Sequence, residues 1–172
     1  RLPHLLDWLK TATPDLLGLQ ETKIIDDKFP REAIIAAGYQ PIYNGQKTYN
    51  GVAILSKLNV EPKEWVTQLP GMEDDPQRRV LAATYGDVRM INVYIPNGAE
   101  VDSEKYQYKL RWLHALVAYI KVELRSHAKL AMVGDFNIAP EDCDVHDPKT
   151  WESSVLVSPA EREYFQQLLS LG

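Results

Sequence analysis

Short apolar segments bounded by turn residues alternate along this chain with segments of helical periodicity, and this alternation constrains the fold more than any other feature. The predicted helices cover residues 2–9, 30–37, 103–124 and 159–171. The third carries one apolar stripe, because its large apolar residues recur three or four positions apart. The predicted strands cover residues 15–19, 39–43, 52–55, 80–85, 88–95 and 129–133.

Turn signals indicate how some of these strands connect. Asn44-Gly45 and Asn50-Gly51 lie between two of them, and Gly86-Asp87 is expected to join the strands at 80–85 and 88–95 as a hairpin. Since hairpins occur beside helix–strand alternation, we predict an α/β (α+β) fold in which a mixed sheet system is flanked by helices.

Composition narrows the class of protein further. The 172 residues suit one domain, and a chain that is 45% hydrophobic and 25% charged can bury a sizeable core. No apolar run approaches the roughly 20 residues that span a bilayer, so no membrane partner is expected. The single cysteine, Cys143, cannot form an internal disulfide, which favours a reducing compartment over secretion.

The net charge of −5 argues against a protein that binds nucleic acid through bulk charge alone. A nuclease remains compatible with this charge, because a site that holds Mg²⁺ must concentrate carboxylates. Its DNA-facing surface would then have to be locally basic. The residues considered for such a surface are Lys23, Lys47, Arg78, Arg79, Lys105, Lys109 and Arg111. Taken singly, each of them is more simply interpreted as a solvated surface charge.

Two acidic residues share one placement in the predicted fold. Glu21 follows the apolar strand that ends at Leu19, and Asp135 follows the apolar strand that ends at Val133. Side chains leave the core at strand ends, where active sites of α/β proteins tend to form. Two carboxylates there could hold Mg²⁺ through hard oxygen ligands, and Asn137 could add a neutral donor. The competing interpretation of each carboxylate is a helix cap or a solvated turn.

Three further segments could contact phosphate. Tyr94 lies late in its strand and could donate its phenol O–H to a phosphate, although a packing role is common there. Asn97 could donate an amide, and Arg78 or Arg79 could form a bidentate phosphate clamp. Lys47, with the backbone amides of its turn, could also approach a phosphate, but taken alone this segment favours a plain surface turn.

Taken together, these segments resemble the exonuclease III and apurinic/apyrimidinic endonuclease family, in the same order along the chain. The matching pieces are Leu17-Gly18-Leu19-Gln20-Glu21-Thr22-Lys23, Gly45-Gln46-Lys47, Gly51-Val52-Ala53, Gln77-Arg78-Arg79, Ile91-Asn92-Val93-Tyr94-Ile95-Pro96-Asn97-Gly98 and Gly134-Asp135-Phe136-Asn137-Ile138-Ala139-Pro140. The pieces at Glu21 and Asp135 are shared by a wider phosphatase superfamily, whereas the others narrow the resemblance to the DNA-repair branch.

The resemblance implies a four-layered sandwich, in which two mixed β-sheets pack face to face with helices on both outer faces. It implies a Mg²⁺-dependent phosphodiesterase of base excision repair, with Mn²⁺ as an alternative metal. The reactions would be incision 5′ to abasic sites and 3′-to-5′ removal of nucleotides from double-stranded DNA. The implied partner is therefore duplex DNA with abasic sites or 3′ ends, bound by a monomer in the cytoplasm beside nucleoid DNA.

The resemblance also assigns roles to individual residues. Glu21 is expected to bind the metal and Tyr94 to contact the scissile phosphate. Asp135 is expected to orient or deprotonate the attacking water, and Asn137 to hold the phosphate; both could also contribute to the metal site. Arg79 and Asn97 are expected to contact the DNA backbone, as Lys47 could from its turn.

The chain departs from the family pattern at both ends. Family members begin with a strand that carries a metal-binding asparagine, and they end with strands that supply a further aspartate and an Asp-His pair. Residues 1–172 are therefore expected to be one domain that lacks its first strand and its C-terminal strands. Alone, this segment is expected to fold poorly and to have little activity.

Two alternatives remain open at this point. The chain could be another phosphodiesterase or phosphatase of the superfamily, acting on an inositol phosphate, a sphingolipid or RNA. It could also be a noncatalytic DNA-binding protein built on a decayed nuclease fold. The presence of Glu21, Tyr94, Asp135 and Asn137 speaks against decay, because drift would have removed some of them.

Overall fold

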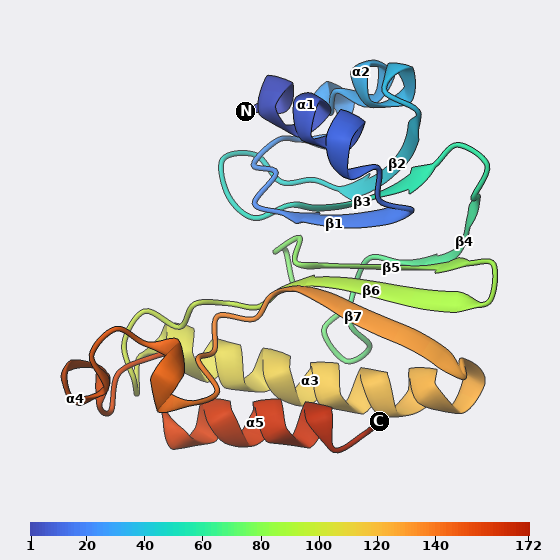
Figure 1. Ribbon diagram of the computed structural model, residues 1–172. Coiled ribbons are helices and arrows are strands. Elements are labelled where there is room, and N and C mark those ends of the chain that lie inside the picture. The colour runs from blue at the N-terminus through green and yellow to red at the C-terminus, as the bar shows by residue number, and fades with distance from the viewer. The chain divides into compact units, whose positions relative to one another are not determined.

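The computed structural model describes all residues from Arg1 to Gly172 (Figure 1). The chain forms two compact units. The first unit consists of Arg1–Gln68, Pro76–Tyr94 and Lys129–Gly134. The second unit consists of Leu69–Asp75, Ile95–Ala128 and Asp135–Gly172. None of the helices combines the length and the apolar character needed to cross a membrane.

Two β-sheets form the centre of the first unit. One has the order β1-β3-β2, with β1 (Leu16–Gln20), β3 (Val52–Lys57) and β2 (Tyr39–Asn44) paired antiparallel. The other has the order β4-β5-β6-β7, with β4 (Pro62–Val66), β5 (Val80–Tyr85), β6 (Val88–Tyr94) and β7 (Lys129–Asp135). The predicted hairpin is β5 and β6, which are antiparallel and pair Tyr85 with Val88.

The core of the first unit lies between these sheets. Ile42 and Ile54 of the three-stranded sheet pack with Leu81, Ala83 and Met90 of the other sheet, all at most 4% exposed. Since side chains alternate across a strand, the neighbouring residues of the three-stranded sheet face the opposite way. That face packs against the helices α1 (Leu2–Ala12) and α2 (Arg31–Ala36) (Figure 1).

The second unit is built around a pair of helices. α3 (Glu104–Ser126) and α5 (Pro159–Leu169) lie side by side (Figure 1). The Ser103 side chain caps α3 by accepting from the Tyr106 N–H. Ser158 and Glu161 form a reciprocal capping box at the start of α5, which satisfies backbone donors that the helix leaves unpaired. A short helix, α4 (Pro148–Trp151), precedes α5.

All four predicted helices and all six predicted strands are present, with ends that differ by up to three residues. β4 and α4 were not predicted from the sequence. β4 has no alternation of apolar and polar residues, because Lys63, Glu64 and Trp65 are all exposed. It is an edge strand that begins with a proline and shifts register between Lys63 and Val66, and such strands carry a weak sequence signal.

Gly134 allows β7 to approach β6 closely just before Asp135. A Cβ atom at Gly134 would lie 1.9 Å from the Val93 carbonyl oxygen, and the residue has a φ of +142°. We expect Gly134→Ala to lower the free energy of unfolding by about 3 kcal/mol or more. Gly86→Ala is the matched control, because φ is +61° there but no atom lies within 4 Å. Urea melts that show equal costs for the two variants would contradict the close-approach explanation.

Candidate active site residues

Glu21 lies directly after β1 in a backbone conformation that is rare for a non-glycine residue, with a φ of +53°. Backbone hydrogen bonds hold the residues that follow it: the Thr22 N–H donates to the Gly51 carbonyl at 3.1 Å, and the Lys23 N–H donates to the Asn50 carbonyl at 3.0 Å. The turn before β3 therefore fixes the direction in which the Glu21 side chain leaves the sheet.

Both carboxylate oxygens of Glu21 have partners. The Tyr94 hydroxyl donates to Oε1, and the Lys23 ammonium lies 2.9 Å from Oε2. The hydrogen bond from Tyr94, and then the one from Lys23, lowers the pKa of Glu21 below its ordinary value. The side chain is 45% exposed, so this ionised carboxylate can be reached by a cation or a phosphate from solution.

Arg79 holds Tyr94 from two sides. Its Nη1 donates to the Tyr94 carbonyl at 3.0 Å, and its guanidinium lies 4.7 Å from the centre of the Tyr94 ring. Its Nε donates to Gln77 Oε1 at 2.7 Å. A planar guanidinium can make these contacts together, whereas an ammonium cannot. The predicted phosphate-contacting arginine is therefore also a support for the phenol of Tyr94.

The two residues of the Gln46-Lys47 segment have different roles: Gln46 makes hydrogen bonds within the protein, and Lys47 faces solvent. Gln46 Oε1 accepts from Asn50 Nδ2 at 2.9 Å and from the Arg78 N–H at 3.0 Å, so Gln46 connects this turn to the segment that precedes β5 and carries Arg79. Lys47 is exposed and makes no hydrogen bond or ion pair. Its ammonium is free to meet an anion.

Asn92 is a supporting residue that the sequence reasoning did not single out for a role. It is fully buried, and its Nδ2 donates to the carbonyls of Leu19 and Ala53, both at 2.9 Å. Its Oδ1 accepts from Gln20 Nε2 at 2.6 Å. Asn92 thus connects β6 to β1 just before Glu21. The signal in the sequence is a polar residue placed between the apolar residues Ile91 and Val93 of this strand.

Asp135 and Asn137 lie together in the second unit, in the segment that leaves β7. The Asn137 N–H donates to Asp135 Oδ1 at 3.0 Å, and Asn137 has a φ of +48°. Asn137 Nδ2 donates to the Ile95 carbonyl at 2.9 Å, and its Oδ1 accepts from Asn97 Nδ2 at 3.3 Å. The structure therefore brings the predicted residues Asp135, Asn137 and Asn97 into one hydrogen-bonded group.

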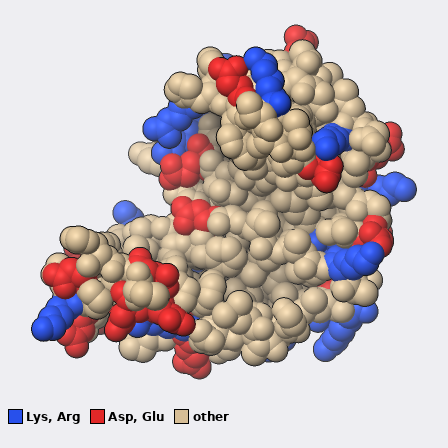
Figure 2. Space-filling view, in the orientation of Figure 1, with Lys and Arg blue, Asp and Glu red and all other residues tan.

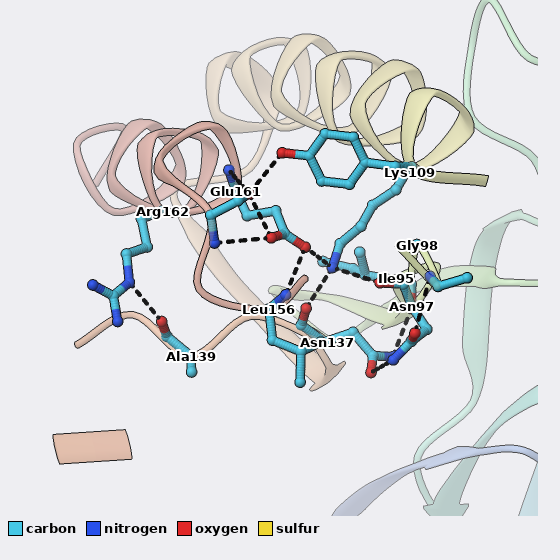
Figure 3. A network of polar contacts seen from close by, with 12 residues as sticks. Ile95, Asn97, Gly98, Lys109, Asn137, Ala139, Leu156, Glu161 and Arg162 are labelled. Carbon is cyan, nitrogen blue, oxygen red and sulfur yellow. Dashed lines mark hydrogen bonds and ion pairs between the residues drawn. The ribbon is translucent and has the colours of Figure 1, made fainter. Parts of the chain in front are cut away.

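Lys109 corrects one expectation from the sequence. It was considered as a DNA-facing cation, but its side chain is completely buried and paired with the equally buried Glu161 of α5 (Figure 3). Lys105 and Arg111, on the same helix, are exposed as expected. A period of about 3.6 residues separates the buried from the exposed positions of a helix, and Lys109 falls on the buried side between Tyr106 and Trp112.

Acidic side chains also gather in one place. Figure 2 shows them clustered around the α4 segment of the second unit, where Glu141, Asp142, Asp144, Asp147 and Glu152 are all exposed. Repulsion between carboxylates and phosphates makes this segment a poor surface for DNA. No group of three or more His, Cys, Asp or Glu side chains is placed to hold a metal ion.

The chain belongs to the Endonuclease/Exonuclease/phosphatase family, whose profile matches residues 2–155. It is 32% identical to the exodeoxyribonuclease III of Haemophilus influenzae over 182 residues, which cover 99% of this chain and 67% of that protein. The family predicted from the motifs is therefore confirmed.

Two solved structures are similar over the whole chain. One is a 3′ phosphatase from Neisseria bound to a product DNA hairpin, with a TM-score of 0.96 and 47% identity. The other is an AP endonuclease from Archaeoglobus fulgidus, with a TM-score of 0.91 and 36% identity. The chain spans 66% of each of these proteins. The predicted α/β fold class, with two β-sheets and flanking helices, is confirmed by this likeness.

Proposed function

We propose that the protein is a divalent-metal-dependent nuclease of DNA repair. In this proposal it hydrolyses phosphate esters at the 3′ ends of duplex DNA and incises the strand 5′ to abasic sites. The observation that carries the proposal is the pair of Glu21 and Tyr94, an ionised carboxylate and a phenol held together and braced by Arg79. The similarity to exodeoxyribonuclease III, to a DNA-bound 3′ phosphatase and to an AP endonuclease supports DNA as the substrate.

The oxygen ligands offered by the chain suit Mg²⁺, with Mn²⁺ as an alternative. Mg²⁺ is usually bound through one or two carboxylates together with water and phosphate oxygens, and so it does not require a cluster of three acidic residues. Glu21 would hold the metal, with oxygen ligands from Asp135 and Asn137 as further candidates. When bound, the metal supplies positive charge that stabilises the developing charge on the phosphate.

Hydrolysis requires an attacking water, and Asp135 is the proposed group that orients it and accepts its proton. The new bond forms between the water oxygen and phosphorus. The bond between phosphorus and the 3′ oxygen breaks, and this oxygen takes up a proton from solvent water, which leaves a 3′ hydroxyl and a 5′ phosphate. Asp135 can act as this acceptor because Asn137 donates only to its Oδ1, leaving Oδ2 available.

The other polar residues of the proposed site hold the phosphate in place. Tyr94 donates its hydroxyl, while Asn137 and Asn97 contribute amide groups. Such fixed donors lower the barrier because they are already oriented toward the charge that develops during the reaction. Arg79 and Lys47 contribute positive charge toward the DNA backbone.

Lys47 permits a clean measurement of one phosphate contact. Neutralising one such contact removes about one counterion from the binding equilibrium. We expect Lys47→Gln to reduce by about 0.9 the steepness with which the logarithm of the DNA-binding constant falls with the logarithm of the salt concentration. The melting temperature should stay the same, since the exposed side chain makes no hydrogen bond or ion pair in the protein. Lys121→Gln, an exposed lysine on α3, should leave the slope unchanged. Equal slopes for Lys47→Gln and the unaltered protein would remove Lys47 from the DNA surface.

The proposed function is tested by giving the whole protein three labelled duplexes. One carries an abasic-site analogue, one a recessed 3′ hydroxyl end and one a 3′ phosphate. Each is incubated with Mg²⁺ and, separately, with EDTA. We expect Mg²⁺-dependent cleavage or phosphate release on at least one duplex, and the relative rates rank the three activities. A folded protein that leaves all three intact but hydrolyses an inositol phosphate, a sphingolipid or RNA would overturn the proposal.

A further inference from the structure

The ion pair between Lys109 and Glu161 is the most deeply buried charged feature of the second unit. Both side chains have no exposed surface. Figure 3 shows the Lys109 ammonium facing the Glu161 carboxylate. Burial lowers the pKa of Lys109, and the hydrogen bond from its ammonium to Glu161 opposes that effect. A buried pair of this kind contributes little stability relative to apolar side chains, because both charges lose their hydration. Its presence therefore calls for an explanation other than stability.

The ammonium group of Lys109 uses all three of its N–H donors. One contacts Glu161, one the Asn97 carbonyl at 3.1 Å and one the Asn137 carbonyl at 2.5 Å. These carbonyls belong to two different segments, one that follows β6 and one that follows β7. A single side chain of α3 thus fixes the backbone of both asparagines of the proposed site.

The same two segments are joined by the side chains of these asparagines. Asn137 bonds to the Ile95 carbonyl, to Asn97 and, through its N–H, to Asp135 (Figure 3 shows the contacts with Ile95 and Asn97). A movement of the Asn137 backbone would consequently move the carboxylate of Asp135. The position of the Asn137 carbonyl, which Lys109 holds, is therefore coupled to the position of the proposed base.

Glu161 anchors the other side of this group. Its Oε1 accepts from the Leu156 N–H at 3.1 Å, and its Oε2 accepts from the Ser158 N–H at 3.1 Å and from the Ser158 hydroxyl at 2.6 Å. The Leu156 carbonyl in turn accepts from the Ala139 N–H at 2.8 Å. The segment that carries Asp135 and Asn137 is thereby tied to the start of α5 at a second point.

We propose that Lys109 is a positioning residue, which fixes the segments 95–99 and 135–139 so that Asn97, Asp135 and Asn137 keep the geometry needed for hydrolysis. Glu161 is the counter-charge that keeps the ammonium in place. This inference rests on the proposed function. It goes beyond that function, because Lys109 acts on the substrate only through the residues that it holds.

A purely structural role makes a different prediction, and a double variant separates the two. Lys109→Met leaves Glu161 buried without a partner and is expected to lower the melting temperature. Lys109→Met/Glu161→Gln removes both charges. The glutamine oxygen can still accept from the Ser158 N–H and retain the capping box of α5, while its NH₂ group replaces the oxygen that accepts from the Leu156 N–H. We expect the double variant to regain part of the melting temperature that Lys109→Met loses, but not the rate. Leu168→Ala, at a buried position about two turns after Glu161 in α5, is the control for destabilisation alone.

The test compares kcat and KM of the whole protein on the DNA substrate that it cleaves best. We expect both Lys109 variants to lower kcat by about 10- to 100-fold with KM within about threefold, as misplacement by roughly 1 Å can do. Leu168→Ala should keep its kcat at temperatures where it is folded. If the double variant recovers both the melting temperature and kcat, the Lys109–Glu161 pair affects only stability, and the inference is overturned.

Amide hydrogen exchange supplies a readout that does not depend on activity. The Ala99 and Asn137 N–H groups donate to Asn97 Oδ1 and Asp135 Oδ1, and we expect both to exchange at least tenfold faster in the double variant but not in Leu168→Ala. Unchanged exchange would overturn the positioning role. If the unaltered protein cleaves none of the DNA substrates, the proposed function fails, and hydrogen exchange alone decides whether Lys109 holds these segments.

Discussion

Asp135→Asn is expected to lower kcat for DNA hydrolysis by a factor of about 10² to 10⁴, the range over which a positioned general base accelerates such reactions. The amide of asparagine cannot accept the proton of the attacking water. Its oxygen can still accept the hydrogen bond that the Asn137 N–H donates to Asp135 Oδ1 at 3.0 Å. The substitution therefore removes the proposed chemistry while it preserves the local fold.

Binding separates this loss of chemistry from a loss of structure. We expect the Asp135→Asn variant to bind duplex DNA at least as tightly as the unaltered protein, because one negative charge is removed. Asp102→Asn is the matched control: Asp102 is an exposed acid of the same unit with a φ of +67°, a conformation that asparagine tolerates. A kcat within threefold of the unaltered value for Asp135→Asn would exclude Asp135 as the base.

The helices and strands that pack against the core could be predicted because their buried positions are apolar and recur with the period of the element. β3 is buried at every position from Val52 to Ser56, and its core is an uninterrupted apolar run. α3 shows its apolar stripe over about four turns, from Tyr106 to Ile120. β4 has no such apolar pattern, because an exposed edge strand needs no apolar face. Predictions from pattern therefore succeed where a segment contributes to the core and fail where it does not.

The same reasoning explains which parts of the candidate site were found. Glu21, Tyr94 and Asp135 could be proposed because each ends or follows a predicted strand. Their supporting residues depend on contacts between distant positions, and sequence spacing carries no information about these. Asn92 contacts Leu19 across 73 positions, and Lys109 contacts Glu161 across 52. The helical period places Lys109 on the apolar side of α3, but a single sequence does not show that Glu161 is its partner.

Metal removal is the other prediction with a large expected effect. EDTA should reduce hydrolysis to background, because Tyr94, Asn97 and Asn137 alone offer no full positive charge to a developing phosphate anion. Added Mg²⁺ should restore the rate, and Mn²⁺ should substitute for it. A protein that keeps its full rate after dialysis against EDTA would contradict the metal requirement and, with it, the role proposed for Glu21.

Two variants beside Glu21 should then shift the Mg²⁺ requirement in opposite directions. Glu21→Gln removes a ligand charge, and we expect the Mg²⁺ concentration at half-maximal rate to rise at least tenfold, since carboxylate charge is a main determinant of Mg²⁺ affinity. Lys23→Met removes the ammonium that lies 2.9 Å from Glu21 Oε2, so this oxygen no longer has a competing cation. We therefore expect the Lys23→Met variant to reach its half-maximal rate at a lower Mg²⁺ concentration than the unaltered protein. A metal bound at the Glu21 carboxylate should bind more tightly when Lys23 is lost and more weakly when the Glu21 charge is lost. If Mg²⁺ titrations of the rate shift the half-maximal concentration in the same direction for both variants, the effect arises from a general disturbance around Glu21.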